Sequence, residues 1–206
     1  MAPKIKLVYF NIRGRGELIR LTLHAGGVPF IDERVDFQDW PSRREECPNG
    51  KLPYIEVAGK MFGETLPIVR FVGAKCNLLG KTDEEKLYVD IVLTQVEHLR
   101  DDVSRPKTDT LLTKGQRKCL EDKLRSETVP RFLQKIEAGV SMGKTGYVLG
   151  SEMTVADLAV WDAVDSLLVS YPNLLDNHPK VLEHRQRIMG LPKIRKYLET
   201  RPQTKL

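Results

Sequence analysis

Cysteine is scarce in this chain, with three residues among 206, and their positions exclude two classes of small protein. Cys47, Cys76 and Cys119 are far apart and form neither a Cys-x-x-Cys pair nor a set with the spacing of metal ligands. A scaffold stapled by disulfides and a structural zinc site are therefore excluded. We expect no metal ion and a reducing, cytoplasmic location.

Long apolar runs are lacking as well. The first residues, Met-Ala-Pro-Lys-Ile-Lys, do not form the apolar region of a signal peptide. No run approaches the roughly 20 apolar residues that a membrane-spanning helix needs. We therefore expect no membrane insertion.

A strong excess of charge of one sign is also absent. The net charge is +5, but 28 acidic residues are interspersed with 33 basic ones along the whole chain. The most basic stretch, residues 184–205, alternates with apolar residues at helical spacing, which is typical of a solvated helix face. No recognition motif accompanies the charge, so we expect no nucleic-acid partner.

Apolar spacing divides the chain into two modules, which its length and its 41% hydrophobic content allow to pack as one compact unit. Before residue 79, short apolar runs and turn residues predict an α/β module. Its expected elements are strands at 4–10 and 30–35, a hairpin of 54–57 and 61–62, and helices at 17–25 and 66–72. From Asp83 onward, apolar residues recur at i, i+3 and i+4, which predicts an all-α module. Its helices are expected from 83 onward and at about 115–138, 154–169, 178–189 and 192–199.

Two further polar features have structural interpretations. Thr154-Val-Ala-Asp157 has the form of a capping box, in which the Asp157 carboxylate accepts a hydrogen bond from the Thr154 amide. His24, His178 and His184 share no motif, and we expect them on helix surfaces or at helix caps.

Chemistry is indicated where Tyr9 ends the first predicted strand, immediately before the basic turn Arg13-Gly-Arg15. A phenol at this position can steer a bound thiol, although a tyrosine without this context is more often an interfacial core residue. Gly50-Lys-Leu-Pro53 precedes another strand and favours a cis bond at Pro53. Such a bond would turn the backbone of Leu52 outward, toward an extended peptide-like ligand. An ordinary turn is the alternative.

Two more segments favour binding of charged groups. Glu64 and Thr65 precede a predicted helix, whose amino end attracts a carboxylate while Glu64 can receive an ammonium group. Simple capping of the helix is the alternative. An indole donor and three cations able to hold a second carboxylate lie nearby in the sequence; they are Trp40, Arg43, Arg44 and Lys51. The combined charges and peptide-pairing edge outline glutathione.

The order of these segments resembles that of the sigma-class glutathione transferases over essentially the whole chain. The run from Tyr9 to Glu17 fits the class pattern Tyr-Phe-Asn-x-Arg-Gly-Arg-x-Glu. Phe37-Gln-Asp-Trp-Pro, Gly50-Lys-Leu-Pro and Glu64-Thr65 follow in the family's order and spacing. The tail is also similar to the glutathione-dependent prostaglandin D synthases of that class.

The resemblance implies a thioredoxin-like α/β N-terminal domain at 1–78, a linker at 79–83 and an all-α domain at 84–206. It also implies a homodimer that uses glutathione as a co-substrate and no other cofactor. Tyr9 would then be catalytic, donating a hydrogen bond to the glutathione sulfur, with Arg15 adding positive potential. Glutathione would be held along its length by Trp40, Arg44, Lys51, Leu52, Pro53, Glu64 and Thr65.

The second substrate is less closely defined by the same resemblance. It implies an electrophile pocket formed by Phe10, Arg15, Leu99 and Arg105. His98 stands where the class commonly has an acid that reaches across the dimer, and Arg105 stands where prostaglandin D synthases have tryptophan.

Three functions remain open on this basis. The first is conjugation of glutathione to small hydrophobic electrophiles. The alternatives are a glutathione-dependent prostaglandin H2 D-isomerase and a crystallin-like, ligand-binding protein of weak activity. A thiol–disulfide oxidoreductase is disfavoured, because the first strand-to-helix turn carries Tyr9 and no cysteine.

Overall fold

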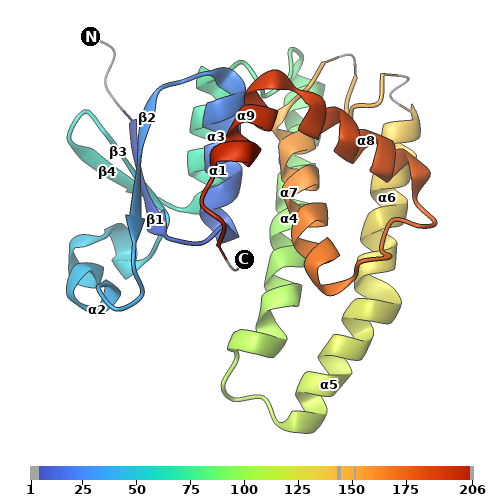
Figure 1. Ribbon diagram of the computed structural model, residues 1–206, viewed down its shortest axis with the longest axis horizontal. Helices are drawn as coiled ribbons and strands as arrows, with labels where there is room; N and C mark the ends of the chain where they lie inside the picture. Colours follow the sequence, from blue (N-terminus) through green and yellow to red (C-terminus); the bar gives the residue numbers. More distant parts are fainter. Residues whose placement is uncertain (1–4, 143–144, 151, 205–206) are drawn as a thin grey trace. The chain divides into compact units, whose positions relative to one another are not determined.

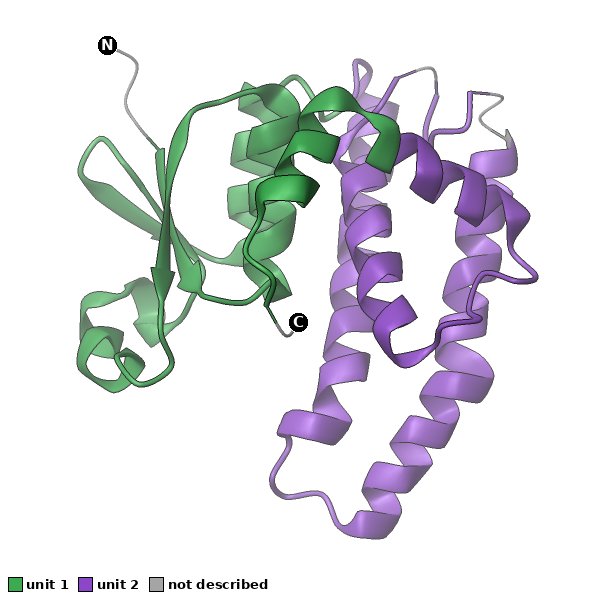
Figure 2. Cartoon of the chain, in the orientation of Figure 1, with its two compact units in different colours: residues 1–79, 189–206 green, residues 80–188 purple. Residues whose placement is uncertain are grey.

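A computed structural model describes residues 5–142, 145–150 and 152–204. The chain forms two compact units, one made of residues 1–79 and 189–206 and the other of residues 80–188 (Figure 2). The predicted α/β module and all-α module are both confirmed in kind. The units nevertheless divide the chain differently from the expected limits of 1–78, 79–83 and 84–206, because the final helix belongs with the α/β unit.

The first unit is built on a four-stranded mixed sheet with the order β2-β1-β3-β4. β1 and β2 are parallel, and the other neighbouring pairs are antiparallel. Helices α1 and α3 lie side by side against the sheet (Figure 1). The elements are β1 (Ile5–Phe10), α1 (Gly14–Gly26), β2 (Phe30–Val35), α2 (Trp40–Arg43), β3 (Tyr54–Val57), β4 (Lys60–Gly63), α3 (Thr65–Lys75) and α9 (Pro192–Thr200).

Helix α1 begins three residues before the predicted start at Glu17. The Glu17 amide donates to the carbonyl of Arg13 at 3.0 Å, so the first turn already includes Gly14 and Gly16. Glycine is a weak helix former, so helix propensity did not predict this first turn. The helix ends at Gly27, whose positive φ of 68° suits a left-handed cap.

The second unit contains only helices among its described residues. Its long helix α4 (Asp83–Thr108) starts at a capping box, in which the Glu85 amide donates to the Thr82 hydroxyl at 3.1 Å. The predicted helix at 115–138 is divided into α5 (Lys114–Lys123), a π-helical stretch at Leu124–Thr128 and α6 (Val129–Met142). Pro130 follows the wide turn, and its missing amide and bulky ring explain why regular α-helix is interrupted there.

Helix α7 (Val155–Ser170) is the buried centre of the second unit, and α8 (Pro179–Gly190) follows it. The carboxylate half of the predicted capping box is confirmed, since the Thr154 amide donates to Asp157 Oδ2 at 2.7 Å. Asp157 Oδ1 also accepts from the Val148 amide at 2.7 Å and lies 3.0 Å from His184 Nε2. The expected surface position of His184 is therefore wrong, because a buried carboxylate gives its ring a polar partner.

No helix in the part of the chain that the structure describes is both long enough and apolar enough to cross a membrane.

Candidate functional site

Three segments far apart in the sequence meet at one end of the sheet. The β1–β3 register pairs Val8 with Tyr54, and the β3–β4 register pairs Tyr54 with Gly63. Tyr9, Pro53 and Glu64 are each one residue beyond these last paired residues, at the same end of the sheet. The strand pairing therefore brings Tyr9, the Leu52–Pro53 segment and the start of α3 to one end of the sheet.

The Tyr9 ring is enclosed by the glycines of the following turn. Its side chain is nearly buried, and its hydroxyl accepts a hydrogen bond from the Arg15 amide at 3.1 Å. A Cβ atom on Gly14 would lie 2.6 Å from the Tyr9 oxygen, and one on Gly16 would lie 2.5 Å from ring atom Cδ1. The two glycines thus make room for the phenol, a function that our reading of the sequence missed although the Gly-Arg-Gly pattern displays it.

Aromatic side chains connect Trp40 to the strand that carries Tyr9. Phe10 meets the Tyr9 ring edge-on at 5.7 Å between centroids and stacks on Phe37 at 4.6 Å. The indole of Trp40 meets Phe10 edge-on at 5.4 Å. Trp40 and Leu52 also pack on one small core cluster, so the structure brings these two predicted site residues together.

The basic segment between β2 and β3 forms short helical turns. α2 is followed by 3₁₀ turns at Arg44–Glu46 and Pro48–Gly50. The Arg44 side chain lies against the second of these turns. Its Nε atom would be 3.5 Å from a Cβ atom added to Gly50. Lys51, the other predicted carboxylate-binding cation, directly follows this turn in the sequence.

Arg43, the third cation of the basic segment, is engaged elsewhere. Its Nη2 atom lies 2.5 Å from Glu33 Oε1, and this carboxylate raises the pKa of Arg43 above its ordinary value. Arg44 and Lys51 are therefore the better candidates for an incoming carboxylate.

The backbone bears on two points raised by the sequence, the predicted cis bond at Pro53 and the alternative in which Glu64 simply caps a helix. The bond between Leu52 and Pro53 is cis, as predicted. Glu64 precedes α3 with φ 70° and ψ 120° and forms no side-chain capping bond, so a simple capping function for its carboxylate is wrong. Positive φ is unfavourable for a residue with a side chain, and such strain is concentrated at functional sites.

The four expected electrophile-pocket residues belong to two units. Phe10 and Arg15 lie in the first unit, at the end of β1 and the start of α1. Leu99 and Arg105 belong to the second unit, where they line a cavity of about 510 Å³ beside α5 and α6. His98 lines the same cavity, together with the cations Lys123 and Arg131.

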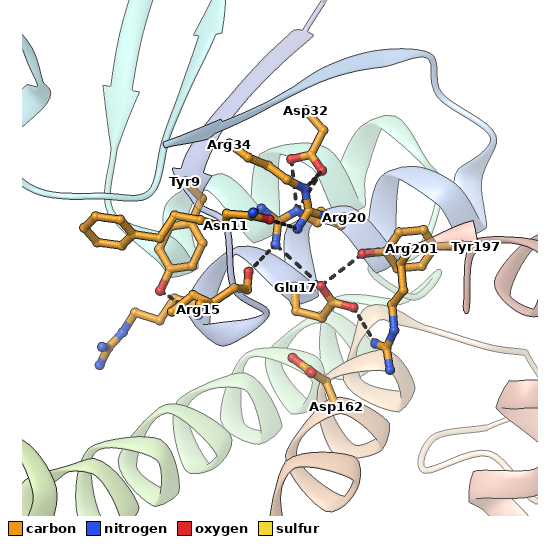
Figure 3. A network of polar contacts seen from close by, with 12 residues as sticks. Tyr9, Asn11, Arg15, Glu17, Arg20, Asp32, Arg34, Asp162, Tyr197 and Arg201 are labelled. Carbon is orange, nitrogen blue, oxygen red and sulfur yellow. Dashed lines mark hydrogen bonds and ion pairs between the residues drawn. The ribbon is translucent and has the colours of Figure 1, made fainter. Parts of the chain in front are cut away.

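A buried ionic network beneath the Tyr9 turn was also missed by sequence reasoning (Figure 3). Glu17 and Arg20 of α1 are almost completely buried. Arg20 Nε lies 3.0 Å from Asp32 Oδ1, and Arg201 Nη1 lies 2.6 Å from Glu17 Oε1. The partners are distant in sequence and follow no local motif, so only the fold reveals them.

No cluster of three or more histidine, cysteine or acidic side chains suited to a metal ion occurs within the described residues.

Known proteins resemble this chain over nearly its full length. The family model "Glutathione S-transferase, C-terminal domain" matches residues 101–201. The Schistosoma japonicum protein "Glutathione S-transferase class-mu 28 kDa isozyme" is 33% identical over 97% of this chain and 99% of its own. The human hematopoietic prostaglandin D synthase is 31% identical over 99% of this chain and 100% of its own.

Solved structures agree with the sequence comparisons. A monomeric glutathione S-transferase from the hookworm Necator americanus superposes with a TM-score of 0.88 and 28% identity. The match covers 98% of this chain and 100% of the hookworm chain. The sheet, the helical unit and the full-length sequence similarity lead to one conclusion: the chain belongs to the glutathione S-transferase family.

Proposed function

We propose that this protein binds glutathione and transfers its thiolate to small hydrophobic electrophiles. The observation that carries the proposal is the placement of Tyr9, Pro53 and Glu64 at one end of the sheet, each next to the last residue paired in the β1–β3 or β3–β4 register. It combines a hydroxyl donor, a cis X-Pro segment and a strained acidic residue before a helix. Glutathione is the co-substrate, and no other cofactor takes part.

In this proposal Tyr9 donates a hydrogen bond to the glutathione sulfur. The thiolate is the nucleophilic form, so stabilising it raises the reactive fraction at neutral pH. Lowering the thiol pKa by about two units corresponds to roughly 2.7 kcal/mol of preferential stabilisation. Arg15 adds positive charge beside the same turn.

The remaining contacts follow the charges of glutathione. Trp40, Arg44 and Lys51 hold the glycine carboxylate, and the backbone of Leu52 beside cis Pro53 pairs with the cysteinyl residue. Glu64 receives the γ-glutamyl ammonium group, and Thr65 with the amino end of α3 receives its carboxylate. Phe10 and Arg15 contribute to the electrophile pocket.

A second candidate function is glutathione-dependent isomerisation of prostaglandin H2 to prostaglandin D2. It is supported by the full-length similarity to the human hematopoietic prostaglandin D synthase. We also place the chain in the sigma class, on the run from Tyr9 to Glu17. Product analysis after incubation with prostaglandin H2 tests the isomerase, and prostaglandin D2 at the uncatalysed level would remove it.

We further propose a cytoplasmic homodimer. Three free cysteines, Cys47, Cys76 and Cys119, suit a reducing compartment. Each unit exposes large apolar side chains that a partner would cover, among them Phe62 of β4 at 50% exposure and Ile91 of α4 at 42%. The hookworm relative described as monomeric makes the oligomeric state a matter for measurement.

The direct test is Tyr9→Phe, with Tyr171→Phe as the matched control because Tyr171 lies after α7, outside the proposed site. Removing the Tyr9 hydroxyl should raise the pKa of the bound thiol and reduce conjugation of an aryl halide at neutral pH on the order of 10²-fold. Unchanged turnover and an unchanged pH profile at saturating glutathione would contradict the proposal.

A further inference from the structure

The buried guanidinium of Arg20 forms hydrogen bonds with the backbone of the turn that follows Tyr9. Arg20 has no exposed surface, and its Nη1 donates to the carbonyl of Ile12 at 2.8 Å. Its Nη2 donates to the carbonyl of Phe10 at 3.4 Å. Arg20 therefore binds the backbone carbonyls on both sides of Asn11. Its guanidinium also lies 5.8 Å from the centre of the Tyr9 ring.

Arg34 of strand β2 adds a second contact to the same turn. Asp32 accepts from Arg20 Nε at 3.0 Å and from Arg34 Nε at 2.8 Å, which fixes both side chains. Arg34 Nη1 in turn donates to Asn11 Oδ1 at 3.3 Å. The turn is thus oriented by fixed side chains as well as by its own glycines (Figure 3).

Glu17 links this assembly to the C-terminal segment. Its Oε2 atom lies 3.5 Å from Arg20 Nη1 and accepts from the Tyr197 hydroxyl at 3.0 Å. Its Oε1 atom accepts from Arg201 Nη1 at 2.6 Å. Burial, together with the adjacent Glu17 carboxylate, raises the pKa of Tyr197 far above its ordinary value, so this hydroxyl stays protonated as a donor. A buried carboxylate needs these partners, because an unpaired charge in the interior is costly.

We propose that Tyr197 and Arg201 are positioning residues for the transferase reaction, acting through Glu17 and Arg20 to hold the turn that carries Tyr9. This inference rests on the function proposed above. Neither residue needs to touch glutathione. Each is linked to the Tyr9 turn by a short series of contacts, from the C-terminal segment to Glu17, from Glu17 to Arg20, and from Arg20 to the backbone carbonyls.

The physical reason is that Tyr197 and Arg20 share one oxygen of Glu17, Oε2. When Tyr197 loses its hydroxyl, Glu17 Oε2 keeps Arg20 as its nearest donor and draws that guanidinium toward itself. Arg20 then holds the carbonyls of Phe10 and Ile12 less well. The Tyr9 hydroxyl and the Arg15 amide move with the turn, and a small displacement of a catalytic group is enough to reduce the rate.

The test measures the pKa of glutathione bound to the protein, from the ultraviolet absorbance of its thiolate as a function of pH. The variants are Tyr197→Phe, which removes one oxygen atom, Arg201→Met, and Arg201→Lys as the conservative replacement. Two control variants lie on α9, the helix that carries Tyr197. Arg195→Met removes an exposed charge, and Ile194→Val shortens a fully buried side chain.

We expect Tyr197→Phe and Arg201→Met to raise the pKa of the bound thiol and to lower kcat/KM at neutral pH on the order of tenfold. The loss should shrink at high pH, where the thiol ionises without assistance. Arg201→Lys should recover part of the effect, and the two control variants should keep the wild-type thiol pKa.

Two outcomes would overturn the inference, and they differ from each other. If Tyr197→Phe and Arg201→Met lower the melting temperature as Ile194→Val does but leave the thiol pKa unchanged, the network only stabilises the fold. If wild type and Tyr9→Phe give the same thiol pKa, the proposed function fails and the inference fails with it.

Discussion

Gly14 and Gly16 both border the Tyr9 ring, but for different physical reasons. Gly14 has a positive φ of 41°, so any side chain there strains the backbone as well as the phenol. At Gly16 no positive φ is involved, and the obstacle is the ring of Tyr9 alone. Gly16 is therefore the cleaner probe of how the position of the phenol affects activity.

We predict that Gly16→Ala lowers kcat/KM at least tenfold and costs about 1–3 kcal/mol of unfolding free energy, because its Cβ atom displaces the Tyr9 ring. The matched control is Gly115→Ala, a helical glycine with nothing within 4 Å of an added Cβ atom. It should raise stability by about 0.5–1 kcal/mol and leave activity unchanged. Urea unfolding and an aryl halide assay measure both, and a fully active Gly16→Ala enzyme would refute this account of the turn.

The three cysteines should differ in their reactivity toward an alkylating reagent. Burial raises the pKa of Cys47 and of Cys76, which lowers their thiolate fractions at neutral pH, whereas Cys119 is exposed. We predict that Cys119 is modified first and Cys47 slowly, with labelling of Cys47 accelerating as the pH rises. Peptide mass spectrometry at successive times measures the order, and rapid modification of Cys47 at neutral pH would contradict it.

At the scale of elements, helix caps differ widely in what they should contribute. Asp157 at the start of α7 is buried and serves Thr154, Val148 and His184, whereas Gln116 at the start of α5 forms the same kind of box at the surface. Burial makes Asp157 hard to replace, because the Val148 and Thr154 amides that donate to it cannot form hydrogen bonds with water instead.

We predict that Asp157→Ala destabilises the protein by about 3 kcal/mol or more, since it leaves buried donors unpaired. Gln116→Ala, the corresponding change in the exposed box, should cost about 0.5–1 kcal/mol. Thermal or urea unfolding of the two variants provides the comparison. Equal losses would show that burial of the cap does not matter here.

Much of this element pattern was predictable from the sequence, and the failures have physical causes. The strands, the cis bond at Pro53 and the Thr154–Asp157 pair depend on neighbours within a few residues. The interruption of the helix before Pro130 depends on how neighbouring turns adapt to a missing amide, which periodicity does not show. His184 looked like a surface residue because its partner lies 27 positions earlier.

At the scale of the whole molecule, the largest sequence separations were the least predictable. Tyr9, Pro53 and Glu64 were proposed as one site because a ligand of known shape connects them. Glu17 and Arg201 are 184 positions apart and have no such template, so neither their pairing nor the assignment of α9 to the α/β unit could be anticipated.

The proposed homodimer gives a prediction at this scale. Phe62→Glu should weaken self-association by at least tenfold, because it places a charge on an exposed apolar side chain that the dimer would bury. Leu111→Glu is the control, since Leu111 is 91% exposed in the loop between α4 and α5. Sedimentation velocity over a range of concentrations measures the change, and wild-type protein that stays monomeric throughout would remove the dimer.

The contact between Glu17 and Arg201 also has a consequence for the order of folding during synthesis. During synthesis the Tyr9 turn and helix α1 leave the ribosome first, and the side chains that pair with Glu17 follow only after some 180 further residues. Until then the nascent chain can pair β1 with its neighbours but cannot satisfy Glu17 from α9. Helix α9 is therefore made long after the turn that it helps to complete, and a chain truncated before Tyr197 would carry every proposed glutathione-binding residue without the proposed support for Tyr9.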